Sequence, residues 1–465
     1  MTRKAYLTLL ASLFLAACQP TSTPESQDST LVVITGATVI DGVSSTPIEN
    51  AVIVIEGDTI QAIGSAGSVE VPPGAQRVDA SGKTIIPGIF NLHAHVARSE
   101  GMESDDQFYN RERIQRDANR YLYYGITHMV SLGIDQEPMI GFLEDQRAGR
   151  TGGARLYSAG YGFAAKDGWI PGNPNLNRPT TPDEARQLVQ ELVQERQPDV
   201  IKIWVDDRLG ELPKLTPELY GAIIEEAHSQ GIKVMAHMYY LEDTKELIRR
   251  GVDGLAHSVR DQEVDDEFLR LAKENGVTQV ATLVGHSSRL AYADGPDFLD
   301  DPALPVLFPP LVLETVSGQE YQANLANSPN LASTREVYAT AAKNLAKVAA
   351  AGIPIAVGTD SGGPGRFQGL WEHREMELMV KAGLTPMQAI QAATANGAKF
   401  LGLEDQYGTL EPGKIADLII LNADPLEDIR NTRNIDEVWM NGERVNRADL
   451  PISTAPPTAQ ERETS

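Results

Sequence analysis

Alternating apolar and polar residues near both ends of the chain predict short β-strands. The predicted strands are residues 31–40, 50–55, 59–63, 414–421 and 436–445. Turn residues separate them, and Asn441-Gly442 is typical of a two-residue hairpin turn. Residues 31–83 and 408–447 are therefore predicted to form one small β-sandwich domain built from both ends of the chain.

The middle of the chain, residues 84–407, alternates apolar strand-like segments with helix-like segments. The predicted strands are residues 84–91, 125–131, 155–159, 200–205, 233–236, 254–256, 279–283 and 353–357. Helix starts such as Thr181-Pro182 lie between them. Eight strand–helix units predict an α/β fold, the (β/α)8 TIM barrel. The longest insertion, residues 286–330, follows the seventh strand and is predicted to be a lid or a substrate wall.

The first 18 residues have the pattern of an export signal. A basic start precedes an apolar run, Tyr6 to Ala17, which is too short to span a bilayer. The run ends in Leu15-Ala16-Ala17-Cys18, which resembles the lipobox of bacterial lipoproteins. That resemblance implies a lipid anchor on Cys18 and a location on the periplasmic side of the bacterial cell envelope. The alternative is an ordinary signal peptide, cleaved near Ala17, with an incidental cysteine.

Polar composition predicts a flexible tether at residues 19–30 and a disordered tail at residues 448–465. The 465 residues are 42% hydrophobic and 22% charged, as in a globular protein. A net charge of −24 argues against a nucleic-acid partner. A single cysteine excludes an intrachain disulfide.

Candidate chemistry lies at the ends of the predicted barrel strands, where TIM barrels place their active sites. His93 and His95 would share one face of the first strand, and imidazole is the commonest metal ligand in proteins. An isolated His-x-His pair is a weak signal. Matching residues follow in four other strands: Lys202, His237, His257 and Asp360.

Lys202 is the most diagnostic of these residues, because Ile201 and Ile203 flank it in a predicted buried strand. A buried lysine costs several kcal/mol unless another group pairs with it or neutralises it. One alternative is an ordinary ion pair at the barrel mouth with Asp206 or Asp207. The histidines and the aspartate on other strands favour a functional role.

Three segments resemble the amidohydrolase superfamily, in its binuclear-metal form with a carboxylated lysine. They are P-G-x4-H-x-H at 87–95, A-T-x3-A-x2-L-G at 393–402 and G-x-L-x2-G-x2-A-D at 408–417. The resemblance covers nearly the whole chain, and its pattern is similar to Xaa-Pro dipeptidase-like and imidazolonepropionase-like members.

The resemblance implies two divalent metal ions, with Zn(II) favoured and Mn(II) or Co(II) as alternatives. His93, His95 and Asp360 would hold the more buried ion. His237 and His257 would hold the more exposed one, and N6-carboxylysine at Lys202 would bridge both.

The implied reaction is attack of a metal-bridging hydroxide on an amide, with Asp360 as general base and then general acid. Tyr239 would polarise the substrate carbonyl, although a packing role is the alternative. His286 and Arg208 are candidate substrate contacts. The predicted substrate is a dipeptide or an N-acyl amino acid.

Two other functions stay open. The same centre could hydrolyse a cyclic amide, a lactone or a phosphotriester, or the chain could be a non-catalytic binding lipoprotein. The expected partners are a small molecule or short peptide, and a membrane through the lipid anchor alone. A homo-oligomer is possible.

Overall fold

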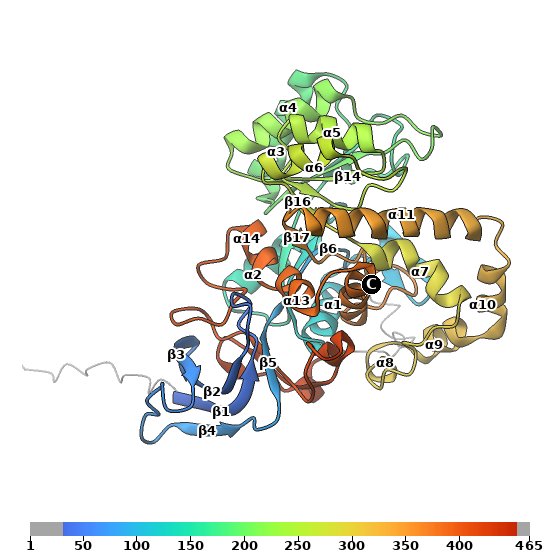
Figure 1. Cartoon of the computed structure of the whole chain (residues 1–465). Helices are drawn as coiled ribbons and strands as arrows, with labels where there is room; N and C mark the ends of the chain where they lie inside the picture. Colours follow the sequence, from blue (N-terminus) through green and yellow to red (C-terminus); the bar gives the residue numbers. More distant parts are fainter. Residues whose placement is uncertain (1–30, 453–465) are drawn as a thin grey trace, which may run out of the picture.

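The computed structural model describes residues 31–452 and contains a β unit, a set of parallel strands and a layer of helices around them (Figure 1). The β unit is one eight-stranded sheet in the order β20-β19-β18-β5-β1-β2-β3, with β4 beside β1. Its strands are β1 Leu31–Val39, β2 Ile48–Glu56, β3 Thr59–Ser65, β4 Gln76–Asp79, β5 Thr84–Pro87, β18 Leu418–Leu421, β19 Ile435–Met440 and β20 Glu443–Arg444. As predicted, strands from both ends of the chain therefore join in one β unit.

The predicted sandwich of two packed sheets is not confirmed, because these strands form a single sheet. Side chains alternate between its two faces. In β1, Val32 and Ile34 belong to one apolar cluster, whereas Val33 belongs to another. The predicted hairpin is confirmed, since β19 and β20 pair antiparallel on either side of Asn441-Gly442.

The predicted strand 84–91 is wrong in its extent, because the chain changes sheets at Gly88. β5 pairs with β1 and β18, whereas β6 Ile89–Ala94 pairs with β9 Ile126–Ser131. A Cβ atom at Gly88 would lie 2.4 Å from the hydroxyl oxygen of Thr127, so only glycine fits this close approach. The β unit therefore passes directly into the strand that carries the first candidate histidine.

All eight predicted central strands are present and run parallel, but they do not form one closed sheet. The first sheet has the order β10-β9-β6, and the second has the order β12-β11-β13-β14-β15-β16-β17. The further strands are β10 Arg155–Ser158, β11 Gly162–Phe163, β12 Leu176–Asn177, β13 Ile201–Val205, β14 Val234–Met238, β15 Gly254–Leu255, β16 Thr278–Val280 and β17 Ile355–Ala356.

Backbone hydrogen bonds nevertheless join the two sheets at both boundaries. The N–H of Asp199 donates to the carbonyl of Ser158 at 2.8 Å, and that of Leu92 donates to Val357 at 2.9 Å. The carboxyl ends of strands from both sheets therefore meet at one site.

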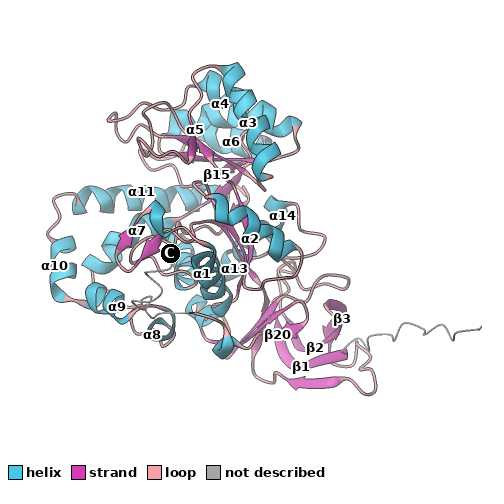
Figure 2. Cartoon of the chain, turned by 180° about the vertical axis from the view of Figure 1, so that it is seen from behind, coloured by secondary structure: helices cyan, strands magenta, loops and turns pink. Residues whose placement is uncertain are grey.

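Helices alternate with these strands and cover them, as the view from behind also indicates (Figure 2). They are α1 Arg111–Tyr123, α2 Glu137–Arg147, α3 Pro182–Arg196, α4 Pro217–Ser229, α5 Leu241–Arg249, α6 Asp266–Glu274, α7 Leu283–Ala293, α8 Leu304–Leu307, α9 Pro310–Ser317, α10 Gln319–Ala326, α11 Leu331–Ala350, α12 Leu370–Ala382, α13 Pro386–Ala393 and α14 Ala395–Leu401.

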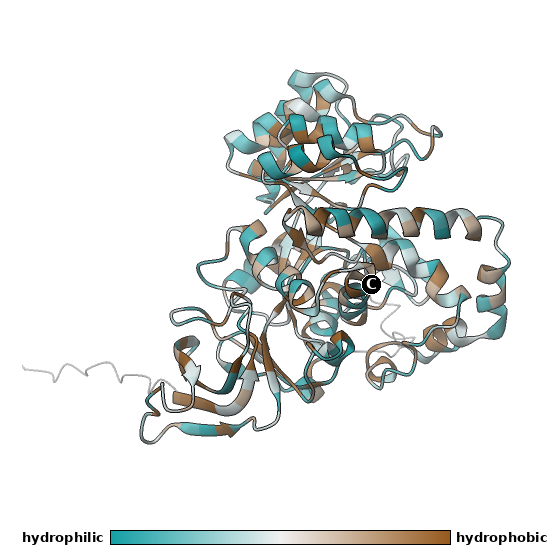
Figure 3. Cartoon of the chain, in the orientation of Figure 1, coloured by the Kyte–Doolittle hydropathy of each residue, from teal (hydrophilic) through white to brown (hydrophobic). Residues whose placement is uncertain are grey.

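Helix α3 illustrates why these segments fold as they do. The side chain of Thr181 accepts a hydrogen bond from the backbone N–H of Glu184, which confirms the predicted N-cap. Ala185, Val189 and Leu192 recur at helical spacing and are buried. Hydrophilic and hydrophobic residues mix along the surrounding helices in the same way (Figure 3).

The predicted insertion at 286–330 is helical rather than an open loop. It consists of most of α7 followed by α8, α9 and α10, which lead into the long helix α11 (Figure 1). Its role as a lid or substrate wall stays a prediction.

The C-terminal end of the described chain is ordered further than the sequence predicts. The predicted disordered tail begins too early, because Arg447–Asp449 forms a 3-10 turn and Asn119 donates a hydrogen bond to the carbonyl of Pro451. The signal peptide, Cys18 and the tether lie outside the described residues, as does the tail from residue 453 on. Within residues 31–452, no helix has both the length and the apolar composition needed to cross a bilayer.

Candidate functional site

One cavity of about 350 Å³ brings together all six predicted metal ligands. His93 and His237 lie in β6 and β14, and Lys202 lies in β13. His257 follows β15, and Asp360 follows β17. Strands of both parallel sheets therefore supply the lining of a single site.

The first group of candidate ligands is His93, His95 and Asp360, whose ligand atoms all lie within 4.8 Å of one another. Asp360 Oδ1 lies 3.0 Å from Nε2 of His95 and 3.6 Å from Nε2 of His93. His93 Nδ1 contacts the carbonyl oxygen of Ala256 at 3.2 Å. Such an outer contact orients the ring and leaves Nε2 free for a metal.

His237 and His257 form the second group. Nδ1 of His237 lies 2.8 Å from Nε2 of His257, so two ligand atoms face each other. Their outer nitrogens have partners: Asp206 lies 2.8 Å from His237 Nε2, and the Thr282 hydroxyl lies 2.7 Å from His257 Nδ1. Burial lowers the pKa of His237 to about 4, against the opposing effect of Asp206, so the ring is neutral at pH 7.

Lys202 is 1% exposed, and its Nζ has no hydrogen-bond partner among residues 31–452. Burial lowers the pKa of Lys202 to about 7, although the charge of Asp360 opposes the shift. The alternative ion pairs are absent: Asp206 pairs with His237, and Asp207 accepts a hydrogen bond from Tyr240. An unpaired buried amine is therefore aimed into the cavity.

Glu372, which the sequence did not point to, holds the two strands of the first group together. Its carboxylate accepts hydrogen bonds from the hydroxyls of Thr359 and Ser361, at 2.7 and 2.8 Å, and from the Asn91 amide. The other end of Asn91 accepts the backbone N–H of His93 at 2.9 Å. The residues next to His93 and Asp360 thus share one buried carboxylate, which positions both ligands.

The donor set fits divalent metal ions. Imidazole and carboxylate ligands suit Zn(II), and outer partners hold three of the four rings. Two further buried nitrogens, His95 Nδ1 and Lys202 Nζ, have no hydrogen-bond partner within the described chain. Carboxylation of Lys202 would explain why its amine has no hydrogen-bond partner, because the added carboxylate would bridge the two metal ions.

Three arginines also line the cavity, and none was predicted. Arg98 pairs with Asp106 at 2.7 Å, and Arg366 pairs with Asp360 at 2.6 Å. Arg260 is buried; it donates to the carbonyl of Met238 at 2.6 Å, and its guanidinium lies 3.9 Å from the Asp206 carboxylate. The signal was present, because Arg260 and Arg366 follow His257 and Asp360 in loops at the carboxyl ends of strands.

The predicted substrate contacts differ in placement. His286 in α7 lines the cavity and is partly buried, and its Nε2 atom is buried without a hydrogen-bond partner among the described residues. Tyr239 does not line the cavity; its ring lies 4.6 Å from the guanidinium of Arg260. Arg208 is exposed, 5.9 Å from the Trp169 ring, and does not line the cavity either. The functional roles of these residues stay predictions.

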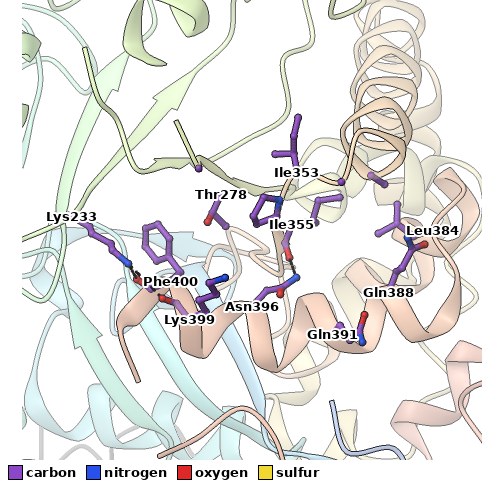
Figure 4. A pocket seen from close by; sticks show the side chains of 14 residues that line it. Lys233, Thr278, Ile353, Ile355, Leu384, Gln388, Gln391, Asn396, Lys399 and Phe400 are labelled. Carbon is purple, nitrogen blue, oxygen red and sulfur yellow. Dashed lines mark hydrogen bonds between the residues drawn. The ribbon is translucent and has the colours of Figure 1, made fainter. Parts of the chain in front are cut away.

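A larger cavity, of about 520 Å³, lies at the opposite ends of the strands (Figure 4). It is lined by residues that precede or begin β14, β16 and β17, together with α13 and α14. Lys233 there donates to the carbonyl of Phe400 at 2.6 Å, and Asn396 donates to that of Ile355 at 2.8 Å. These polar groups already serve the fold, and catalytic residues of such barrels lie at the carboxyl ends.

The sequence model of the amidohydrolase family matches residues 84–445. The chain belongs to the amidohydrolase family. It is 26% identical to an ochratoxinase of Aspergillus niger, over 91% of this chain and 88% of that protein. It is 23% identical to an imidazolonepropionase of Flavobacterium johnsoniae, over 80% and 85% of the two chains. A solved Xaa-Pro dipeptidase structure superposes with a TM-score of 0.71 at 24% identity, covering 89% of this chain and 99% of that one.

Membership of the amidohydrolase family makes the chain a hydrolase, and members of this family typically use a divalent metal. The cluster of His93, His95 and Asp360 agrees with that chemistry. The family fold is usually a TIM barrel, and the parallel strands of this chain correspond to it.

Proposed function

We propose that the protein is a metal-dependent amidohydrolase that cleaves the amide bond of a dipeptide or an N-acyl amino acid. The observation that carries the proposal is the gathering of six candidate ligands in one cavity around an unpaired buried lysine. His93, His95 and Asp360 would hold one ion, His237 and His257 a second, and N6-carboxylysine at Lys202 would bridge them. Zn(II) is the favoured metal.

The chain's own residues then have distinct tasks. Divalent ions supply a nucleophile at neutral pH and polarise the scissile carbonyl. Although burial alone would raise it, Arg366 and the neighbouring histidines hold the pKa of Asp360 well below its ordinary value. The ionised Asp360 can therefore accept a proton from the attacking water and pass it to the leaving amine.

The arginines favour an anionic substrate. The protein carries a net charge of −24, yet Arg98, Arg260 and Arg366 all line the cavity. Arginine binds carboxylates well because its planar donors match the two oxygens. Dipeptides and N-acyl amino acids carry a carboxylate next to the scissile amide. The similarity to an ochratoxinase and to an Xaa-Pro dipeptidase supports the same class.

The test combines metal analysis with a substrate panel. We expect about two zinc ions per chain by plasma mass spectrometry, and hydrolysis of dipeptides and N-acyl amino acids. Amidated forms of the same substrates should react at least about tenfold more slowly, because they lack the carboxylate. Turnover of lactones, cyclic amides or phosphotriesters alone would overturn the amide assignment. Absence of bound metal and of turnover together would favour a binding protein.

We also propose that the protein is exported as a lipoprotein anchored through Cys18. The support is the apolar run ahead of Leu15-Ala16-Ala17-Cys18, and Cys18 is the single cysteine of the chain. Cells that express the full chain should incorporate radioactive palmitate into it, and Cys18→Ala should abolish this label. Export with cleavage but without label would indicate an ordinary signal peptide instead.

A further inference from the structure

Four apolar side chains line the same cavity and form what we call the apolar wall: Ile134, Trp169, Ile170 and Trp204. They pack together in a small cluster that is separate from the main core. The Trp169 ring lies 4.5 Å from the ring of His237, so the wall reaches a candidate metal ligand. The cavity therefore offers an apolar surface as well as its arginines.

The backbone of the apolar wall is strained. Ile134 and Ile170 have φ angles of 62° and 51°, in the left-handed region that β-branched residues rarely adopt. Strain of this kind persists only where surrounding structure imposes it, and it concentrates at functional sites. Both strained residues line this one cavity.

Arg178 imposes the shape of the loop that carries Trp169 and Ile170. Its guanidinium donates to three backbone carbonyls of that loop: Ala165 at 2.7 Å, Trp169 at 3.0 Å and Ile170 at 2.6 Å. No carboxylate within residues 31–452 forms a salt bridge with Arg178 at 4 Å or less. The side chain is therefore committed to holding this loop.

Trp204 is fixed from the other side by two glycines. A Cβ atom at Gly162 would lie 2.3 Å from the Trp204 ring, and one at Gly133 would lie 2.7 Å from it. The indole ring thus occupies the space that a side chain at position 162 or 133 would need. Its ring centroid lies 5.2 Å from Nζ of Lys202, so this part of the wall also borders the candidate metal site.

We propose that the apolar wall, positioned by Arg178, selects substrates that carry a large apolar side chain beside the scissile amide. This rests on the proposed function and narrows its substrate class to acylated or dipeptide forms of aromatic and other bulky amino acids. Trp169 would contact the substrate. Arg178 would be a positioning residue, because its donors are used within the loop.

The test compares N-acetyl-phenylalanine with N-acetyl-alanine, using the metal-loaded full chain. We expect the wild-type enzyme to prefer the former in kcat/KM, and Trp169→Ala to reduce that preference at least about tenfold. Trp169→Phe should retain most of it. Arg178→Gln should reduce it through KM while kcat and metal content stay close to wild type.

Arg447 provides a matched control, because it too donates to three carbonyls, those of Tyr123, Ile435 and Asp436, but does not line the cavity. Arg447→Gln should leave the preference unchanged. An equal fall for both substrates in Trp169→Ala would overturn the proposal.

A binding measurement separates failure of this proposal from failure of the proposed function. If the wild-type enzyme hydrolyses neither compound and no dipeptide or other N-acyl amino acid, the proposed function is contradicted. Calorimetric affinities for phenylalanine and alanine then decide the role of the wall. A preference for phenylalanine that Trp169→Ala removes supports the wall, and equal affinities in wild type overturn it.

Discussion

Replacing Lys202 with methionine should lower kcat/KM by about 10³-fold or more and reduce the bound metal below two ions per chain. Lys202 is buried and unpaired beside both groups of candidate ligands. Methionine keeps the apolar part of the side chain but offers no amine for carboxylation. Steady-state kinetics and plasma mass spectrometry on the same samples would measure both effects.

Carboxylation of Lys202 should also make zinc reloading depend on bicarbonate and on pH. Only the neutral amine reacts with carbon dioxide, and burial lowers the pKa of Lys202 to about 7 in the metal-free protein. Reloading of metal-free protein with zinc should therefore require bicarbonate. It should proceed faster above pH 7 and slow down as the pH falls below 7, because the amine then becomes protonated.

Lys214 is a suitable control for this substitution, because it lies in the loop after β13 and pairs with Asp243 at 2.6 Å, outside the cavity. Lys214→Met should leave metal content and kcat/KM within a few fold of wild type. Full metal content in Lys202→Met, or reloading that is independent of bicarbonate, would contradict a bridging carboxylated lysine.

Replacing Asp360 with asparagine should lower kcat by about 10² to 10⁴-fold, the range expected when a general acid–base is removed. The amide preserves the shape of the side chain but cannot accept the proton of the attacking water. Arg366 would also lose its charged partner, which lies 2.6 Å away. The measurement is kcat under saturating substrate, with metal content determined in parallel.

Replacing Asp206 with asparagine distinguishes a loss of metal affinity from a loss of proton transfer. Asp206 contacts the outer nitrogen of His237 at 2.8 Å, so its loss should weaken metal binding by about 10- to 100-fold. Excess zinc should restore its activity, whereas it should not restore that of Asp360→Asn. Recovery of Asp360→Asn by zinc alone would show that Asp360 serves as a ligand without transferring protons.

Much of the candidate site was predictable because its residues lie at the carboxyl ends of strands that the sequence predicts. Parallel strands expose their carboxyl ends at one edge, so His93, His237 and Asp360 could be assigned to the same place from strand positions alone. The apolar neighbours Ile201 and Ile203 likewise predicted the burial of Lys202, which the structure confirms.

Other features depend on contacts between distant segments, which no local pattern encodes. Residues 85–90 carry no polar side chain to mark a boundary, and the change of sheets at Gly88 is seen only in its close approach to Thr127. The β-rich ends could form a sandwich or a single sheet with the same alternation, and strand pairing made them a single sheet.

The sequence by itself determined the α/β class, the eight parallel strands and the six candidate ligands, because periodicity and strand ends are local properties. The tertiary structure alone decided that Glu372 joins the two ligand-bearing strands and that Lys202 lacks a carboxylate partner. It also placed three arginines and the apolar wall around the ligands. These contacts join segments up to several hundred residues apart, so the tertiary fold sets the partner of each side chain.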